Sequence, residues 1–194
     1  MWERSATPSA VGLPRRTRAT LAGVFILTAY LMLFAEATDS GAITFIVDVL
    51  SGLSVIGIAI LLYPLFRPSS RIASAVYFWA RMAEGVIMIA AGTLFLAGKT
   101  GVRDDLYEYV QIYFFIIGAA VMYYLLYQTR LVPRFIAIWG FVAVAVLVLT
   151  TVLSWFDFSN PALDATLVLM ITNEIFLAIW LMARGFNETA VAAR

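Results

Sequence analysis

The sequence predicts an all-α, polytopic integral membrane protein: a six-helix transmembrane bundle with both termini in the cytoplasm. Of its 194 residues, 63% are hydrophobic and only 13% are charged, whereas soluble domains average roughly 45–50% and about 25%. Six apolar stretches approach or exceed the length of about 20 residues that a helix needs to cross a bilayer. Basic residues gather in every second connection, which is typical of loops that stay in the cytoplasm.

The chain begins with a basic leader, residues 1–18, which contains two prolines and ends in three arginines. Such a leader before an apolar stretch resembles a signal peptide. No small-residue cleavage site precedes Glu36, however, so we expect the first helix, about 20–35, to stay uncleaved in the membrane. The polar turn 36–41 closes this helix.

The second helix is expected at about 42–66, because Pro64 and Pro68 mark its exit as residues that continue a helix poorly. The third follows at about 71–98 and the fourth at about 106–128. Tyrosines lie near both ends of the fourth helix, as expected where a helix meets the two interfaces of a bilayer: Tyr107, Tyr109, Tyr113, Tyr123, Tyr124 and Tyr127.

The fifth helix, about 133–156, has a proline in its first turn, where the missing N–H does no harm. The sixth, about 163–184, is followed by Gly185, a residue type that commonly ends helices. The six helices form one predicted transmembrane domain, 19–186, followed by a short cytoplasmic tail, 187–194. Because the connections are short, sequential helices should be antiparallel neighbours.

The orientation follows from the basic residues. Ten of the 13 lie on the side of the two termini, which predicts that this side is cytoplasmic. Those ten are Arg4, Arg15, Arg16, Arg18, Arg67, Arg71, Arg130, Arg134, Arg184 and Arg194. Only Lys99 and Arg103 are expected in loops on the other side. The loops there are acidic instead, with Glu36, Asp39, Asp104, Asp105, Asp157 and Asp164.

Charged and polar residues near the middle of predicted helices are the candidates for a functional site, because charge at that depth is costly and normally faces protein or water. Arg81 and Glu84 are three apart on the third helix and so lie on one face. Asp48 lies nearer the outer end of the second helix, where Ser51 and Gly52 add a small, polar face typical of helix contacts in lipid. The candidate intramembrane polar cluster is Arg81, Glu84, Asn173, Glu174, Asp48 and Gln111.

Two interpretations of this cluster stay open. In the first, Arg81 pairs with Glu84 or Glu174 and fixes the packing of the bundle. In the second, the cluster binds an ion, a proton or a polar substrate, because two mid-membrane glutamates against one arginine leave a surplus carboxyl that desolvation favours in its protonated form. A metal site built from Asp48, Glu84 and Glu174 would suit hard cations, but Asp48 is expected too far toward the outer face.

Composition argues against most enzyme chemistry. Histidine and cysteine are absent, which removes the commonest general base, the usual zinc ligands and thiol nucleophiles. We therefore expect no cofactor, no metal and no nucleic acid, and favour a non-enzymatic structural, regulatory or small-molecule-binding protein. The alternative is a small transporter or proton-coupled permease; an enzyme acting on a lipid or quinone has the least support. Expected partners are the lipid bilayer, with anionic lipid at the basic face, and a second copy or another membrane protein.

Three segments resemble a known family. They are residues 81–85 (RMAEG), 131–140 (LVPRFIAIWG) and 173–186 (NEIFLAIWLMARGF). In this order and spacing they resemble the bacterial membrane proteins grouped as domain of unknown function 4386. The resemblance extends from the first predicted helix to Phe186 and implies six helices in a bacterial cytoplasmic membrane. It implies no activity, substrate or cofactor.

Overall fold

The computed structural model describes residues 13–35, 40–156 and 167–187, and these are helical with no strand among them, which confirms the predicted all-α class. The elements are α1 (Arg15–Ala29), α2 (Met32–Ala35), α3 (Gly41–Phe66), α4 (Arg71–Leu96), α5 (Thr100–Leu106), the single π-helical turn η1 (Tyr107–Gln111), α6 (Ile112–Thr129), α7 (Arg134–Ser154) and α9 (Leu167–Ala183). Several predicted features lie outside the described residues: the leader up to residue 12, the acidic loop residues Glu36, Asp39, Asp157 and Asp164, and the tail from residue 188.

Four helices are long and apolar enough to cross a membrane: α3, α4, α7 and the continuous helix Thr100–Thr129 that α5, η1 and α6 form together. This indicates a membrane protein. The predicted ranges of the second, third and fifth helices agree with α3, α4 and α7 to within two residues at each end. The first and sixth predicted spans correspond to the shorter α1 and to the described part of α9. A count of six spans and the cytoplasmic position of the termini therefore stay predictions.

Two boundaries differ from the prediction. Helix α1 begins at Arg15, inside the predicted leader, and stops at Ala29 rather than near residue 35. No proline or glycine marks this stop; the chain turns where Tyr30 leaves the helix to bond with a distant side chain described below. The fourth helix begins at Thr100 rather than at about 106, so Arg103 lies on a helix and not in an exposed loop. Its charge is neutralised inside the protein by Asp48.

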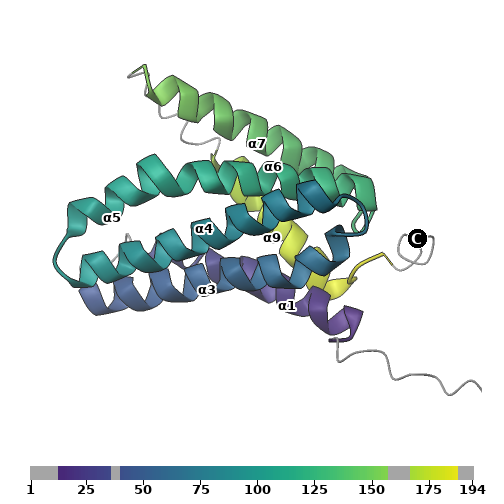
Figure 1. The fold of residues 1–194 in the computed structure, drawn as a ribbon, viewed down its shortest axis with the longest axis horizontal. Coiled ribbons are helices and arrows are strands. Elements are labelled where there is room, and N and C mark those ends of the chain that lie inside the picture. Colours follow the sequence, from purple (N-terminus) through teal and green to yellow (C-terminus); the bar gives the residue numbers. More distant parts are fainter. Residues whose placement is uncertain (1–12, 36–39, 157–166, 188–194) are drawn as a thin grey trace, which may run out of the picture.

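The helices form a closed ring in chain order: α1 packs on α3, α3 on α4, α4 on α6, α6 on α7, α7 on α9, and α9 returns to α1. One end of the ring, at the right of Figure 1, carries the start of α1, the α3–α4 and α6–α7 turns and the end of α9. We call it the basic end, because the following residues lie there: Arg15, Arg16, Arg18, Arg67, Arg71, Arg130, Arg134 and Arg184. Toward the opposite end, α7 diverges from α5 and α6 (Figure 1).

At the basic end the last helix is fastened to the first. Gly185 follows α9 with φ +75°, so the predicted glycine that ends this helix is confirmed. The guanidinium of Arg16, on α1, donates to the backbone oxygens of Met182 at 2.8 Å and Ala183 at 3.0 Å. A cation at the C-terminus of a helix also interacts favourably with the helix dipole. This contact helps to close the ring.

Helices α3 and α4 cross closely through two glycines. A Cβ built on Gly52 would lie 2.5 Å from the backbone oxygen of Gly85, and a Cβ on Gly85 would lie 2.6 Å from the backbone oxygen of Gly52. This confirms the predicted use of a small-residue face of the second helix for helix packing. With no side chain at either position, the two backbones approach one another directly.

Gly52→Ala is therefore expected to destabilise the protein, whereas the same change at Gly101 is not. The added methyl at Gly52 must push α3 from α4, at a cost of roughly 1–3 kcal/mol. Gly101, on α5, has nothing within 4 Å of a built Cβ, and alanine there should gain up to about 1 kcal/mol of helix propensity. Thermal unfolding of both variants in the same detergent checks this prediction, and equal effects would contradict the close crossing.

Candidate functional site

The centre of the ring holds an arginine between two glutamates. Arg81 Nη1 donates to Glu84 Oε2 at 2.9 Å and to Oε1 at 3.2 Å. Arg81 Nη2 lies 3.8 Å from Glu174 Oε1, on α9. Arg81 and Glu84 are only 5% and 2% exposed. Arg81 is thus buried and paired as predicted, with both carboxylates as partners and Glu84 as the nearer one.

Two more side chains complete this arrangement, which we call the central cluster: Arg81, Glu84, Gln111, Glu174 and Tyr30. Gln111 Nε2 donates to Glu84 Oε1 at 3.3 Å, and the Tyr30 hydroxyl donates to Glu174 Oε2 at 2.9 Å. Sequence reasoning missed Tyr30, because a tyrosine late in a predicted span looks like an interface residue. Its position at the stop of α1 places it beside the charges.

The guanidinium of Arg81 also touches α6. It lies over the Phe115 ring, 5.1 Å from the ring centroid, where a cation is attracted to the face of the aromatic ring. A Cβ on Gly118 would lie 3.0 Å from Arg81 Nε, so the absence of a side chain at that position makes room for the arginine. Helix α6 therefore shapes the space that Arg81 occupies.

Asn173 is next to Glu174 in the sequence, but its side chain contacts a different helix, α7. Its Nδ2 donates to the backbone oxygen of Ile136, on α7, at 3.2 Å. The structure therefore does not bring Asn173 into contact with Arg81, and its bond instead ties α9 to α7. Adjacent residues on a helix point about 100° apart, so the pair reaches two different helices.

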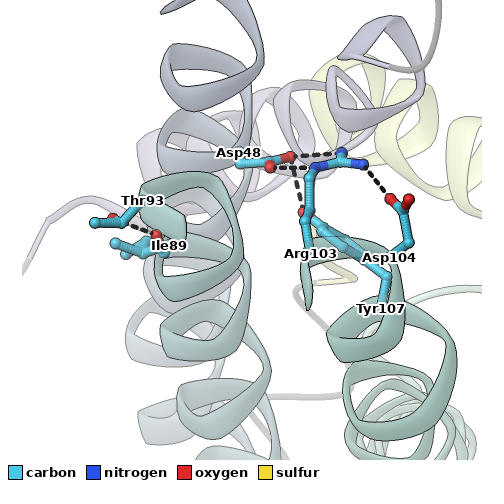
Figure 2. A network of polar contacts seen from close by, with 6 residues as sticks. All are labelled: Asp48, Ile89, Thr93, Arg103, Asp104 and Tyr107. Atoms are coloured by element: carbon cyan, nitrogen blue, oxygen red, sulfur yellow. Dashed lines mark hydrogen bonds and ion pairs between the residues drawn. The ribbon is translucent and has the colours of Figure 1, made fainter. Parts of the chain in front are cut away.

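Asp48, the remaining candidate, belongs to a second site nearer the opposite end (Figure 2). Arg103 donates to it twice, from Nε to Oδ2 at 2.8 Å and from Nη2 to Oδ1 at 3.1 Å. The Tyr107 hydroxyl donates to Oδ1 at 2.9 Å. We call Asp48, Arg103 and Tyr107 the second cluster. The prediction that Arg103 lies in a loop is wrong: Arg103 lies on α5 and is 7% exposed, and Asp48 is fully buried.

The surroundings of Arg103 explain its burial. The guanidinium lies 4.8 Å from the ring centroid of Tyr107 and 5.6 Å from that of Phe95. Asp104 contributes an outer contact at 3.4 Å from Arg103 Nη1. Aromatic faces and a two-point carboxylate contact satisfy a guanidinium well in a low-dielectric setting. No sequence signal fixed this pairing, since Asp48 and Arg103 lie on predicted segments far apart in the chain.

The π-helical turn η1 places both clusters on one face of the helix Thr100–Thr129. From Arg103 to Phe115 an ideal α-helix would turn about 3.3 times, which would leave the two side chains on different faces. A π turn accommodates one extra residue and restores the alignment. As a result Arg103 and Tyr107 face α3, while Gln111 and Phe115 face the central cluster.

A cavity of about 40 Å³ adjoins the central cluster and is lined by Arg81, Glu84, Gln111, Glu174 and Tyr30 together with apolar side chains. A space of roughly 10–15 Å³ is enough to hold one water molecule. Within the described residues, Arg81 Nε and Glu174 Oε1 are buried atoms with no hydrogen-bond partner. The cavity thus has the size and the polar atoms to hold a few waters.

Among the residues that the structure describes, no group of three or more histidine, cysteine, aspartate or glutamate side chains could hold a metal ion. The central cluster consists of a guanidinium, two carboxyls, an amide and a phenol. These groups can bind water and exchange protons. They define a class of protein: an all-helical bundle with helices of membrane length around a buried, water-sized polar site.

The chain belongs to the family described as domain of unknown function DUF4386, whose sequence pattern matches residues 19–185. The resemblance seen in the three sequence segments is thereby confirmed. No curated protein matches the chain, and no solved structure matches it. The family description names no activity, so function has to be argued from the central cluster.

Proposed function

We propose that the protein is a non-enzymatic integral membrane protein of the bacterial cytoplasmic membrane, and that its central cluster binds and releases one proton. The observation that carries this proposal is that two carboxyls share one guanidinium beside a water-sized cavity. If both were ionised, the cluster would carry a net charge of −1. An uncompensated charge is costly away from water, and one proton removes it.

Hydrogen bonding favours Glu174 as the carrier of the proton. Glu84 accepts two hydrogen bonds from Arg81 and one from Gln111, as expected of an ionised carboxylate. Glu174 accepts one from Tyr30, and its Oε1 is without a hydrogen bond within the part of the chain that the structure describes. One proton on Glu174 would neutralise it and leave the ionised Glu84 paired with Arg81.

The size of the cavity argues against a metabolite. Sites for small molecules usually measure about 300–1,000 Å³, and the central cavity is about 40 Å³. The packing of the basic half argues against a permease in this conformation. There the ring is filled by a continuous apolar core that includes Leu62, Phe66 and Leu126, whereas a transporter needs a polar path to both faces. We therefore favour a proton-responsive regulatory role over transport.

Infrared difference spectroscopy of the purified protein tests the shared proton. At neutral pH we expect the carbonyl stretch of one buried, protonated carboxyl. Glu84→Gln and Glu174→Gln should each abolish this band, because one remaining carboxylate then matches one guanidinium. Glu108→Gln is the matched control, since Glu108 is exposed and lies outside the cluster. The absence of the band in the wild type, or its survival in either single variant, would contradict the proposal.

We further propose that the basic end faces the cytoplasm and contacts anionic lipid. The basic rim described above supports this orientation, because basic residues are enriched in cytoplasmic loops and attract acidic headgroups. Reporter fusions after Arg194 and within 68–71 should read cytoplasmic, and fusions within 99–105 should read external. An external reading after Arg194 would contradict the proposed orientation.

A further inference from the structure

The half of the bundle between the central cluster and the opposite end contains two buried polar stripes. The first runs along α3 through Thr44, Asp48 and Ser51, whose spacings of four and three residues place them on one helix face. The Thr44 hydroxyl is buried, with no hydrogen-bond partner among the described residues. The Ser51 hydroxyl lies 3.5 Å from the backbone oxygen of Thr28, just before α1 stops. This stripe therefore reaches the level of Tyr30 and the central cluster.

The second stripe runs along the facing helix through Arg103, Tyr107 and Gln111. Arg103 and Tyr107 line a groove of about 520 Å³ between this helix and α7, which diverges from it. Gln111 lines the central cavity and donates to Glu84. Tyr107 and Gln111 are the first and last residues of the single π-helical turn η1. One stripe of side chains thus links the groove to the cavity.

The basic half also contains buried hydroxyls that have no hydrogen-bond partner among the described residues, those of Tyr77, one turn from Arg81 on α4, and Tyr123. The groove at the basic end, however, is lined by Pro133, Trp180 and residues 184–187, and by neither tyrosine. The ring there is filled by the apolar core, and the buried hydroxyls of Ser74 and Thr129 donate to carbonyls of their own helices, at 2.6 Å in each case. A hydroxyl bonded in this way does not bridge to the central cluster. The two halves of the bundle therefore differ in whether their buried polar side chains line a groove at the surface.

We infer that protons reach the central cluster from the opposite end of the bundle, through transient water along these two stripes, and not through the basic half. The inference rests on the proposed function. Hydronium in the groove is the proton source; the Glu174 carboxylate accepts the proton and water is left behind. The Asp48–Arg103–Tyr107 contacts hold the two stripes against one another. Access from one side is what a sensor of external acidity requires.

Silver-ion reactivity of single cysteines tests the route, because the chain has no native cysteine. Silver is a small thiol-reactive cation and is used in nitrate buffer. The protein is then denatured and treated with a maleimide, and a cysteine that has reacted with silver is no longer labelled. Ser51→Cys and Thr44→Cys lie on the α3 stripe and change side-chain volume little. Ala119→Cys is the control, since Ala119 is fully buried in the apolar core of the basic half. Sealed vesicles with either the basic end or the opposite end of the protein outward allow silver to be added to one face at a time.

We expect silver at the opposite-end face to abolish labelling of Ser51→Cys and Thr44→Cys, silver at the basic face to leave it intact, and Ala119→Cys to be protected from both faces. Protection of both stripe cysteines at the opposite-end face would overturn the inference. Reaction of Ser51→Cys from the basic face, or of Ala119→Cys from either face, would overturn it as well. These outcomes are independent of the infrared band, so a failed route and a failed proton site can be told apart.

Discussion

Arg81→Leu is expected to lower the free energy of unfolding by about 3–5 kcal/mol, because removing one partner of a buried ion pair leaves the other charge uncompensated. Here the Glu84 carboxylate loses its counterion, and uptake of a second proton by the cluster reduces the loss. The change should appear as a lower yield of monodisperse protein in detergent and a lower midpoint of thermal unfolding.

A second substitution in the same chain identifies the partner. Adding Glu84→Gln or Glu174→Gln to Arg81→Leu should restore part of the lost stability, because either change removes a carboxyl that would otherwise have to be neutralised without Arg81. Glu84→Gln should restore more, since Glu84 lies at 2.9 Å from Arg81 and Glu174 at 3.8 Å. If Arg81→Leu leaves stability unchanged or raises it, Arg81 is not a structural tie and both glutamates line a hydrated site instead.

Asp48→Ala should have an effect of similar size at the second cluster. It removes the two-point contact to Arg103 and the acceptor for Tyr107, and it leaves a buried guanidinium with only an outer partner. Loss of one partner of such a pair costs about 3–5 kcal/mol. Unfolding of the variant by heat or by denaturing detergent, relative to wild type, measures this cost.

Asp104→Ala provides a matched control on the same arginine. Asp104 lies 3.4 Å from Arg103, but its side chain is 69% exposed, and exposed ion pairs contribute only about 0–1 kcal/mol. The two variants remove the same functional group from the two sides of one guanidinium. If they destabilise the protein equally, burial of the Asp48–Arg103 pair is not what holds α3 against α5.

The sequence was sufficient for the helical class and for the central charges. Hydrophobic length located α3, α4 and α7, and the cost of charge at mid-membrane depth singled out Arg81, Glu84 and Glu174. Gln111 was found because it lay at a suitable depth on the fourth predicted helix. A functional residue can be predicted in this way when a charged or polar side chain interrupts an otherwise apolar helix, because that signal lies within one segment of the sequence.

Other features were not predictable, because they depend on contacts between distant segments. Arg103 looked like a loop residue among other charges, and only the approach of Asp48 makes its burial favourable. Tyr30 resembled an interface tyrosine, and no residue next to it in the sequence predicted that α1 would end at Ala29. The π turn at Tyr107–Gln111 rotates the residues that follow it relative to those before it, so that the two sets contact different helices. Local helix propensity does not predict such a turn.

The closed ring has a consequence for biogenesis. The ribosome completes α4 long before α9, so Arg81 enters the membrane when Glu174 has not yet been synthesised. Glu84, three residues along the same helix, emerges together with Arg81 and neutralises it in the nascent chain. We therefore expect the two glutamates to act at different times: Glu84 during insertion of α4, and Glu174 only when the last helix arrives and the ring closes.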